Sequence, residues 1–512
     1  MPRRTPSSAT IAVVFAVVFV AALAWPGVAR AFCGFYVAEG SAKLYNNATQ
    51  VVLLRDGTRT ALAMQNNYQG PTERFAMVVP VPVILKKEQV KTLERGVFDK
   101  IDQLDAPRLV EYWEQDPCWV PPPEEEELFG LGMRKADMAM PVEQTAAAPL
   151  VRVEAKFAVG EYDVVILSAE DATALEAWLK QEHYAIPEGS EPYFRPYVQA
   201  GSKFFVAKVD PQRVKFENGM ATLSPLRFHY DAESFSLPVR LGLVNAKDAQ
   251  DLIVHVLAKG KRFEVANYPN VTIPTNLDVA DSVRASFPTF YASLFDATVA
   301  KNPKAVVTEY AWEAASCDPC PGPALEDNDL VVLGGDTLAA PPRAWEWTLT
   351  RLHARYTKEA LGADLVFKEA GAIVGGREFV VAAGGLEKGA QPSTVNNFQA
   401  RYVIRHEWTG PIACKSPRRG VWGGNPAGQG SGPTPARNLA FAPRGAFDLA
   451  ASLKSEAAEL GLGPKTLPPM GTPAAPERRY VLLGVPLWVW AASVVVIIAI
   501  FVGVLRRKRP AS

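Results

Sequence analysis

The chain has 512 residues, 48% of them hydrophobic, and its 54 basic residues balance its 54 acidic ones. A chain of this length can bury a large apolar core, and five cysteines are too few for a small scaffold that depends on disulfide bonds. Its stability must therefore come mainly from the burial of apolar side chains.

The first 31 residues have the pattern of a secretory signal peptide. Arg3 and Arg4 precede an apolar stretch over residues 11–23, and Ala29-Arg30-Ala31 places small residues at a cleavage site. We expect the mature chain to begin at Phe32. The alternative is an uncleaved N-terminal anchor.

The C-terminal end has the pattern of a membrane anchor. Residues 481–505 form an uncharged stretch that is long enough for a transmembrane helix. Trp488 and Trp490 lie near its outer end. The basic residues 506–509 follow and would stay on the cytoplasmic side. The two ends predict a single-pass type I membrane protein whose ectodomain is periplasmic or extracellular.

The charge of the predicted ectodomain differs from that of the whole chain. Without the three basic residues of the signal and the four of the tail, 47 basic residues remain against 54 acidic ones, a net charge of −7. Nucleic-acid binding needs a basic surface, so this balance argues against it. The membrane is the only predicted partner, and the nature of any protein or envelope ligand stays open.

Strands and helices follow each other irregularly along the ectodomain. Asp56-Gly57 separates two alternating runs and predicts a β-hairpin, and apolar residues at helical spacing predict a helix over 86–104. Ser168 is expected to cap another helix, and residues 276–300 to form a third that is rich in aromatic side chains.

We therefore expect an α+β fold: a strand-rich ectodomain of two or three packed modules, plus one C-terminal transmembrane helix. The predicted segments are a signal peptide at 1–31, a strand-rich module with one helix at 32–118, an acidic and proline-rich linker or insertion at 119–148, an α+β module at 149–275, a module of helix and strands with a CDPC motif at 276–414, a Gly/Pro/Ala-rich stalk at 415–480, a transmembrane helix at 481–505 and a cytoplasmic tail at 506–512.

The five histidines do not form a zinc-binding motif, and the sequence contains no phosphate loop and no nucleophile elbow. His353 alternates with Arg351 and Arg355, which places three basic side chains on one strand face. An anion site is one interpretation of this pattern, and we favour a histidine whose hydrogen bonds are satisfied inside the fold. The sequence therefore predicts no catalytic residue, no cofactor and no metal site.

The cysteines are the remaining candidate site residues. Cys317 and Cys320 have the Cys-x-x-Cys spacing of redox centres, but Pro321-Gly322-Pro323 follows directly and prevents a regular helix there. We expect a structural disulfide, either between Cys317 and Cys320 or from one of them to Cys414. Cys33 and Cys118 are the expected second pair.

Several segments resemble the bacterial envelope proteins grouped as domain-of-unknown-function family 2330. The similar text is "CGFYVAEGSAKLYNNATQVVLLRDGTRTALAMQNNYQG", "FAMVVPVPVIL", "LDAPRLVEYWEQDPC", "TEYAWEAASCDPCPGP" and "LTRLHARY", which spans about residues 33–415. The resemblance implies a secreted or membrane-anchored bacterial protein and brings no activity, cofactor or catalytic residue.

Two functions follow from these observations. The first is a membrane-anchored extracytoplasmic binding or structural module, stabilised by disulfides, and this interpretation leans against an enzyme. The alternative is an extracytoplasmic thiol-disulfide oxidoreductase that uses Cys317 and Cys320.

Overall fold

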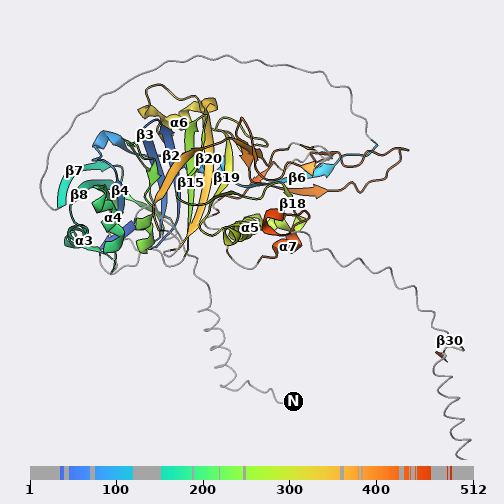
Figure 1. Ribbon diagram of the computed structural model, residues 1–512, viewed down its shortest axis with the longest axis horizontal. Coiled ribbons are helices and arrows are strands. Elements are labelled where there is room, and N and C mark those ends of the chain that lie inside the picture. The colour runs from blue at the N-terminus through green and yellow to red at the C-terminus, as the bar shows by residue number, and fades with distance from the viewer. Residues whose placement is uncertain are drawn as a thin grey trace, which may run out of the picture. The chain divides into compact units, whose positions relative to one another are not determined.

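A 13-stranded sheet runs through the middle of the fold, and its strands come from residues 45 to 399 (Figure 1). Its path is β11-β12-β3-β2-β15-β20-β19-β26-β22-β25, and β13, β5 and β17 join beside it. The strands are β2 (Tyr45–Asp56), β3 (Arg59–Gln69), β5 (Val90–Thr92), β11 (Lys215–Glu217), β12 (Met220–Thr222), β13 (Leu226–Asp231), β15 (Gln250–Lys259), β17 (Asn270–Thr272), β19 (Val306–Glu313), β20 (Trp347–Tyr356), β22 (Ile373–Gly375), β25 (Gln391–Pro392) and β26 (Asn397–Gln399).

The computed structural model describes most of the chain between residues 35 and 462. The described ranges are 35–39, 45–69, 75–118, 151–186, 189–217, 220–245, 249–357, 362–378, 380–381, 385–425, 432–437, 439, 444, 447–462, 481–482 and 485–486.

Smaller sheets complete the strand architecture. The six-stranded sheet has the order β7 (Val151–Val159), β8 (Tyr162–Ala169), β10 (Lys203–Val209), β4 (Phe75–Val81), β1 (Phe35–Glu39) and β9 (Tyr184–Ala185). The five-stranded sheet contains β18 (Leu277–Asp278), β27 (Arg401–His406), β6 (Arg108–Glu114), β28 (Trp422–Gly423) and β29 (Thr434–Pro435). A three-stranded sheet contains β14 (Ser236–Leu237), β21 (Leu365–Ala370) and β16 (Arg262–Val265). A two-stranded sheet contains β23 (Val380–Val381) and β24 (Gly385–Leu386).

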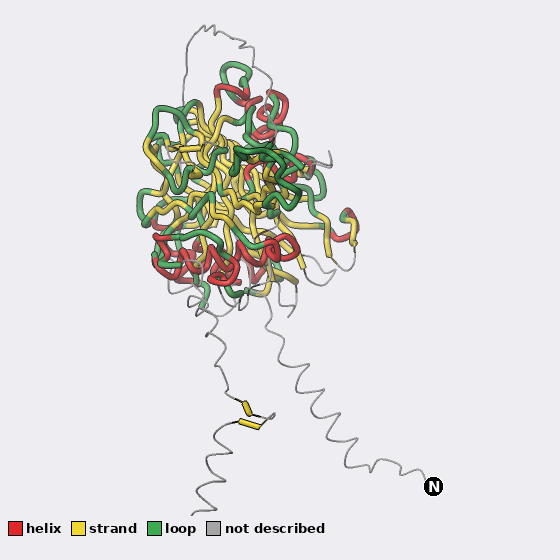
Figure 2. Tube along the Cα trace, turned by 90° about the vertical axis from the view of Figure 1, so that its right-hand side faces the viewer, coloured by secondary structure: helices red, strands yellow, loops and turns green. Residues whose placement is uncertain are grey.

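The helices lie at the periphery of these sheets (Figure 2). The α-helices are α2 (Gly96–Asp105), α3 (Ala172–Gln181), α4 (Glu191–Gln199), α5 (Phe287–Lys301), α6 (Asp327–Leu333) and α7 (Leu449–Ser452). The short 3-10 helices are η1 (Lys87–Gln89), η2 (Pro211–Arg213), η3 (Arg240–Asn245), η4 (Asp281–Ser286), η5 (Gly335–Thr337), η6 (Ala344–Glu346) and η8 (Ala458–Leu460).

The elements stack into four layers, which are α3 with α4, the six-stranded sheet, the large sheet, and α2 with α5 and α6. Alternating apolar residues on the strands fill the spaces between the layers. Phe75 and Met77 of β4 pack with β2 and β15 of the large sheet, whereas Ala76 and Val78 pack against α3 and α4. The other face of the large sheet is covered by α5 around Ile253 and by α2 and α6 around a second apolar cluster. Because successive strand residues point to opposite faces, the middle strands bury both of their faces.

The strand-rich α+β class is confirmed, but the expected division into modules is wrong. The large sheet takes β2 from 32–118, β15 from 149–275 and β20 from 276–414, so these three segments share one sheet. Residues Met1–Pro464 form one compact unit. Pairing between strands far apart in sequence, which local patterns do not specify, joins the segments.

The predicted stalk is also wrong over its first part. β28 and β29 pair with β6, and Leu453 and Ala457 are buried against α5. The chain therefore remains in the folded unit up to residue 462, although its composition is rich in Gly, Pro and Ala. The rest of the expected stalk, 463–480, lies outside the described residues.

The predicted β-hairpin at Asp56-Gly57 is confirmed, and Gly57, with φ of 55°, closes the turn between β2 and β3.

Two predicted helices begin later than expected. The segment expected as a helix over 86–104 first forms β5, which pairs with β13, and α2 starts at Gly96. Similarly, residues 277–278 pair with β27, and α5 begins at Phe287 with a proline in its first turn. In both segments, strand pairing overrides helical spacing.

The helix that Ser168 was expected to cap, α3, is capped by a different residue. Ser168 remains in β8, where it pairs with Lys203, and Asp171 caps α3 by accepting a hydrogen bond of 2.9 Å from Ala174 N. Two side chains of similar capping ability lie three residues apart, and the length of β8 decides between them.

The termini contribute little to the described structure. The signal-peptide region 1–31 and the linker 119–148 lie outside it. In the second unit, Lys465–Ser512, strands β30 (Val481–Leu482) and β31 (Val485–Pro486) pair, so a helix does not begin at Val481, and most of the predicted span lies outside the described residues. Among the described residues, no helix has the length and apolar character that crossing a bilayer requires.

Candidate functional site

A row of buried charged side chains lies on the face of the large sheet that α2 and α5 cover. Alternate residues of β15 and β20 point to this face, and cross-strand pairing sets His255 opposite Arg351 and Asp251 opposite Arg355. We call the following side chains, each at most 3% exposed, the buried charged belt: Asp102, Asp105, Asp251, His255, Glu309, Arg351 and His353.

Arg351 holds one end of the belt together. Its Nη1 donates hydrogen bonds of 2.8 Å to Asp102 Oδ1 and to Asp105 Oδ1, both on α2, and its Nε donates one of 2.7 Å to Glu309 Oε2. His255 Nδ1 lies 2.6 Å from Asp105 Oδ2. Asp102 and Asp105 face the sheet together because residues three apart lie on the same side of a helix. One guanidinium therefore links α2 to two strands.

His353 joins this end to the second half of the belt. Its Nδ1 lies 2.7 Å from Glu309 Oε1 and its Nε2 lies 3.1 Å from Asp251 Oδ1, while Phe295 stacks on the ring at 3.8 Å between centroids. Each ring nitrogen faces a carboxylate, so both must carry a proton to donate. Burial lowers the pKa of His353, and the attraction of Glu309 and Asp251 outweighs this and raises it above its usual value.

Glu309 is the central anion of the belt. It lies at an irregularity in the pairing of β19 with β20, between Thr308 and Tyr310. Besides Arg351 and His353, the Tyr291 hydroxyl donates to it at 2.6 Å. Burial alone would raise its pKa, but these partners lower it to about 2. The carboxylate is therefore ionised at neutral pH although it is fully buried.

The belt reaches the surface beside α5. Arg444 Nη2 donates to Asp251 Oδ1 at 2.9 Å, and its Nη1 donates to Asp296 at 2.5 Å; Arg355 also donates to Asp251. Tyr291, Phe295 and Asp296 all belong to α5. The belt therefore fixes the position of this helix on the sheet as well as that of α2.

The donor types of a metal site occur within the belt. Asp102, Asp105 and His255 bring donor atoms within 4.8 Å of one another. However, Arg351 already bridges the two carboxylates, and its positive charge would repel a cation placed between them. These side chains fit an ion-pair network and do not fit a metal ion.

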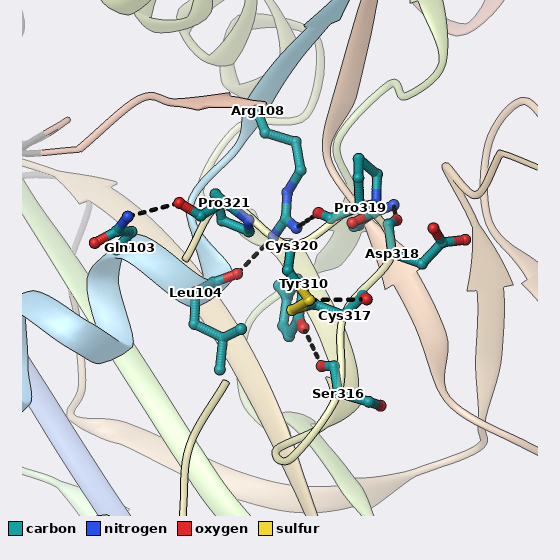
Figure 3. The surroundings of a disulfide bond; sticks show 11 residues. Gln103, Leu104, Arg108, Tyr310, Ser316, Cys317, Asp318, Pro319, Cys320 and Pro321 are labelled. Carbon is teal, nitrogen blue, oxygen red and sulfur yellow. Dashed lines mark hydrogen bonds between the residues drawn. A yellow bond between two sulfur atoms is a disulfide. The ribbon is translucent and has the colours of Figure 1, made fainter. Parts of the chain in front are cut away.

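The Cys317–Cys320 disulfide closes a loop that four other elements hold (Figure 3). Backbone carbonyls on both sides of the disulfide accept hydrogen bonds from side chains of α2, β6, β19 and β26. The donors are Gln103 to Pro321 O at 2.6 Å, Arg108 to Pro319 O at 2.8 Å, Tyr310 to Ser316 O at 3.5 Å, and Gln399 to Asp318 O. The loop therefore acts as a covalent fastening between elements that are far apart in sequence.

This geometry differs from that of a redox centre. Cys320 is exposed and Cys317 half-buried, and residues 321–326 form no helix, since α6 begins at Asp327. The absence of a helix after the motif was predicted from the two prolines and is confirmed for this loop. A helix N-terminus, which lowers the pKa of catalytic cysteines, is therefore missing at this motif.

The second disulfide joins Cys118 to Cys414, with 5.5 Å between their Cα atoms. The expected pair of Cys33 with Cys118 is therefore wrong, as is a bridge from the CDPC motif to Cys414; Cys33 lies outside the described residues. β6 and β27 are parallel, with Glu111 opposite Ile404, so both chains leave the sheet at the same end. The cysteines that follow the two strands meet there.

A pocket of about 590 Å³ opens at the C-terminal end of α5. Lys301 and Asn302 form one wall, the segment 388–389 and Glu459 of η8 form others, and β17 and Leu460 contribute apolar surface. Among the described residues, Lys301, Lys388 and Glu459 have no ion-pair partner, unlike most charged groups of the belt. A volume of this size lies in the range of small-molecule sites.

Sequence analysis found part of these features. Arg351, His353 and Arg355 lie on one face of β20, as predicted, and both ring nitrogens of His353 face carboxylates. The carboxylates of the belt and the charged residues of the pocket were missed. The i, i+3 spacing of Asp102 and Asp105 on an otherwise apolar helix face was the signal available for the belt.

The chain was also compared with known proteins. Neither the curated proteins nor the solved structures contain a match. The family described as an uncharacterised protein conserved in bacteria, DUF2330, matches residues 27–368. This range contains the CDPC loop, the belt and Lys301, whereas Lys388, Cys414 and Glu459 follow it. Since the match covers more than half of the sequence, the chain belongs to the DUF2330 family.

Proposed function

We propose that this protein is an extracytoplasmic binding module, anchored to the membrane by residues 481–505, that holds a small polar ligand in the pocket at the end of α5. The observation that carries this proposal is the set of three charged groups, Lys301, Lys388 and Glu459, that line the pocket without an ion-pair partner among the described residues. Charged groups that converge on a cavity and remain unpaired are available to a ligand.

The rigidity of the pocket wall supports this function. α5 is held by the Tyr291–Glu309 hydrogen bond of 2.6 Å in its first half and by the Arg444–Asp296 ion pair of 2.5 Å in its second half, toward the pocket. A wall that is fixed before the ligand arrives loses little conformational entropy on binding. In this interpretation the buried charged belt is the support of the site and does not itself contact the ligand.

The extracytoplasmic location is supported by the sequence at both ends and by the two disulfides. Disulfides persist in oxidising compartments and are rare in the cytosol. The signal peptide at residues 1–31 and a transmembrane helix within 481–505 remain predictions. Protease treatment of intact cells and of spheroplasts tests them: the ectodomain should become accessible outside the cytoplasmic membrane, and a protected ectodomain would contradict the proposed topology.

Ligand binding can be tested by blocking the pocket. Thr272 is half-buried on the edge strand β17 and lines the cavity, so a Thr272→Trp substitution should fill part of it without disturbing the core. Val366→Trp, at a residue that is 37% exposed on β21 and outside the pocket, is the matched control. Thermal unfolding of the whole protein is measured with amino acids, short peptides, sugars and organic acids.

At least one of these compounds should raise the unfolding temperature of the wild type and of Val366→Trp, and not that of Thr272→Trp, since a ligand stabilises only the protein that binds it. If no compound acts in this way, the pocket is not a binding site for them and the proposal is wrong.

A second function rests on the exposure of Cys320, which an oxidoreductase would need. Insulin reduction by the purified protein tests it. We expect no turnover, because no helix begins at the motif to stabilise a thiolate. Turnover that is lost in Cys320→Ser would favour the oxidoreductase instead.

A further inference from the structure

We infer that the pocket takes a small zwitterion with more carboxylates than ammonium groups, such as an acidic amino acid or a short acidic peptide. This inference rests on the proposed binding function and specifies its ligand. It follows from which charges of the pocket are already neutralised within the protein and which are not.

The wall formed by α5 contributes one positive charge. Thr298 Oγ1 donates to Leu294 O at 2.8 Å, and Asn302 Nδ2 donates to Thr298 O at 2.9 Å, so these two polar side chains already have partners within the helix. Lys301, in the last turn of α5, is exposed and has no ion-pair partner among the described residues. This wall therefore offers a cation to a ligand.

The opposite walls contribute one positive and one negative charge. Lys388 follows Glu387, which is 8% exposed and is fixed by Arg377 at 2.7 and 2.9 Å and by a bond of 2.7 Å from Asn276 Nδ2 to its carbonyl. Glu459 lies in η8, between Ala457 and Leu462, whose backbones bridge with Ala457 N donating to Leu462 O at 2.8 Å. Both charged residues therefore extend from backbone that is held in place.

The fourth charged residue of the lining is already neutralised. Glu264 Oε1 lies 2.8 Å from Arg262 Nη2, and the Arg262 side chain is 7% exposed. Two ammonium groups and one carboxylate remain for a ligand. Their complement is a molecule with two carboxylates and one ammonium group, and Val271, Pro274 and Leu460 provide apolar surface for its aliphatic part.

A purely anionic ligand fits this lining less well. An inorganic phosphate or a dicarboxylic acid would satisfy the two lysines but would leave Glu459 facing a like charge. A basic peptide would meet two cations. The ammonium group of the ligand is therefore the feature that distinguishes this inference from simple anion binding.

Calorimetric titration of the whole protein tests the inference with four probes: the dipeptide Ala–Glu, its N-acetylated form, the dipeptide Ala–Gln, and inorganic phosphate. Ala–Glu should bind best. Removal of the ammonium group by acetylation, or of the side-chain carboxylate in Ala–Gln, should each weaken binding about tenfold, the effect of one charged hydrogen bond. Phosphate should bind more weakly than Ala–Glu.

Variants of the pocket should reproduce the same losses. Glu459→Gln should weaken Ala–Glu binding about tenfold and abolish the difference between Ala–Glu and its acetylated form, whereas Lys388→Gln should weaken both forms alike. Lys368→Gln, at an exposed lysine of β21 outside the pocket, is the control and should leave binding unchanged. The coupling between Glu459 and the ammonium group is the decisive readout, because a folding defect would weaken all probes equally.

The ligand class is overturned if Ala–Glu does not bind, or if acetylation leaves its affinity unchanged. If another compound nevertheless stabilises the wild type and not Thr272→Trp, the binding function stands and only the ligand class fails. If Thr272→Trp responds to every compound as the wild type does, both fail.

Discussion

Replacement of Arg351 by methionine should be among the most destabilising single changes in this protein. The side chain is fully buried, and its guanidinium contacts Asp102, Asp105 and Glu309 at 2.7–2.8 Å. Methionine fills a similar volume with an apolar chain, so the change removes the positive charge with little loss of packing. The three carboxylates then remain inside the protein with less compensation.

The magnitude follows from the cost of an uncompensated buried charge. Removing one partner of a buried ion pair typically costs about 3–5 kcal/mol. Here one cation serves three carboxylates, so we expect a loss of at least about 4 kcal/mol in the free energy of unfolding at neutral pH. Combining the change with Glu309→Gln should restore part of this loss, because the central anion disappears together with the cation.

Urea unfolding monitored by tryptophan fluorescence measures this loss. Arg59→Met is the matched control: Arg59 pairs with Asp231 at 2.9 Å, but both side chains are at least 31% exposed, so the expected cost is below about 1 kcal/mol. If Arg351→Met costs no more than Arg59→Met, or if Glu309→Gln brings no recovery in the double variant, the belt does not hold the sheet and its helices together as argued above.

Three further predictions test other parts of the structure. Protonated His353 has a raised pKa, so the stability it contributes is complete below its unfolded pKa of about 6.5 and is lost as the pH rises through the folded value; His353→Gln should lack this alkaline decline. Cys118→Ser should lower the free energy of unfolding by about 3–5 kcal/mol and Cys317→Ser by about 2 kcal/mol. The first variant opens a loop whose ends are 296 positions apart in sequence, and the second opens one whose ends are 3 positions apart. Removal of 463–512 should leave a folded protein, whereas removal of 415–512 should not.

Each of these has a clear contrary result. Parallel pH profiles of the wild type and His353→Gln in urea unfolding would mean that His353 is not charged in the fold. Equal losses for the two cysteine variants, measured without reductant, would contradict the loop-length argument or the pairing itself. A cooperative thermal transition for the protein that ends at residue 414 would mean that 415–462 is not required for folding and behaves as the expected stalk.

The sequence predicted local features well where a short segment contains the whole signal. The Asp56-Gly57 hairpin, the strand face with Arg351 and His353, and the absence of a helix after Cys320 all depend on neighbouring residues. Helix starts were less predictable, because the first residues of two expected helices pair with distant strands instead. A backbone hydrogen bond to a partner more than 100 residues away leaves no trace in local spacing.

Composition and short motifs, by themselves, determined the α+β class, the family resemblance and the local Cys317–Cys320 ring as one of the alternatives. Only the tertiary structure decided that the expected modules share one sheet, that Cys118 pairs with Cys414, and that scattered carboxylates converge on Arg351 and His353. The physical reason is the same in each case. Parallel and long-range strand pairing brings together residues up to 327 positions apart, such as Arg108 and Pro435, and the pairing is set by the burial of whole sheet faces and not by any one segment.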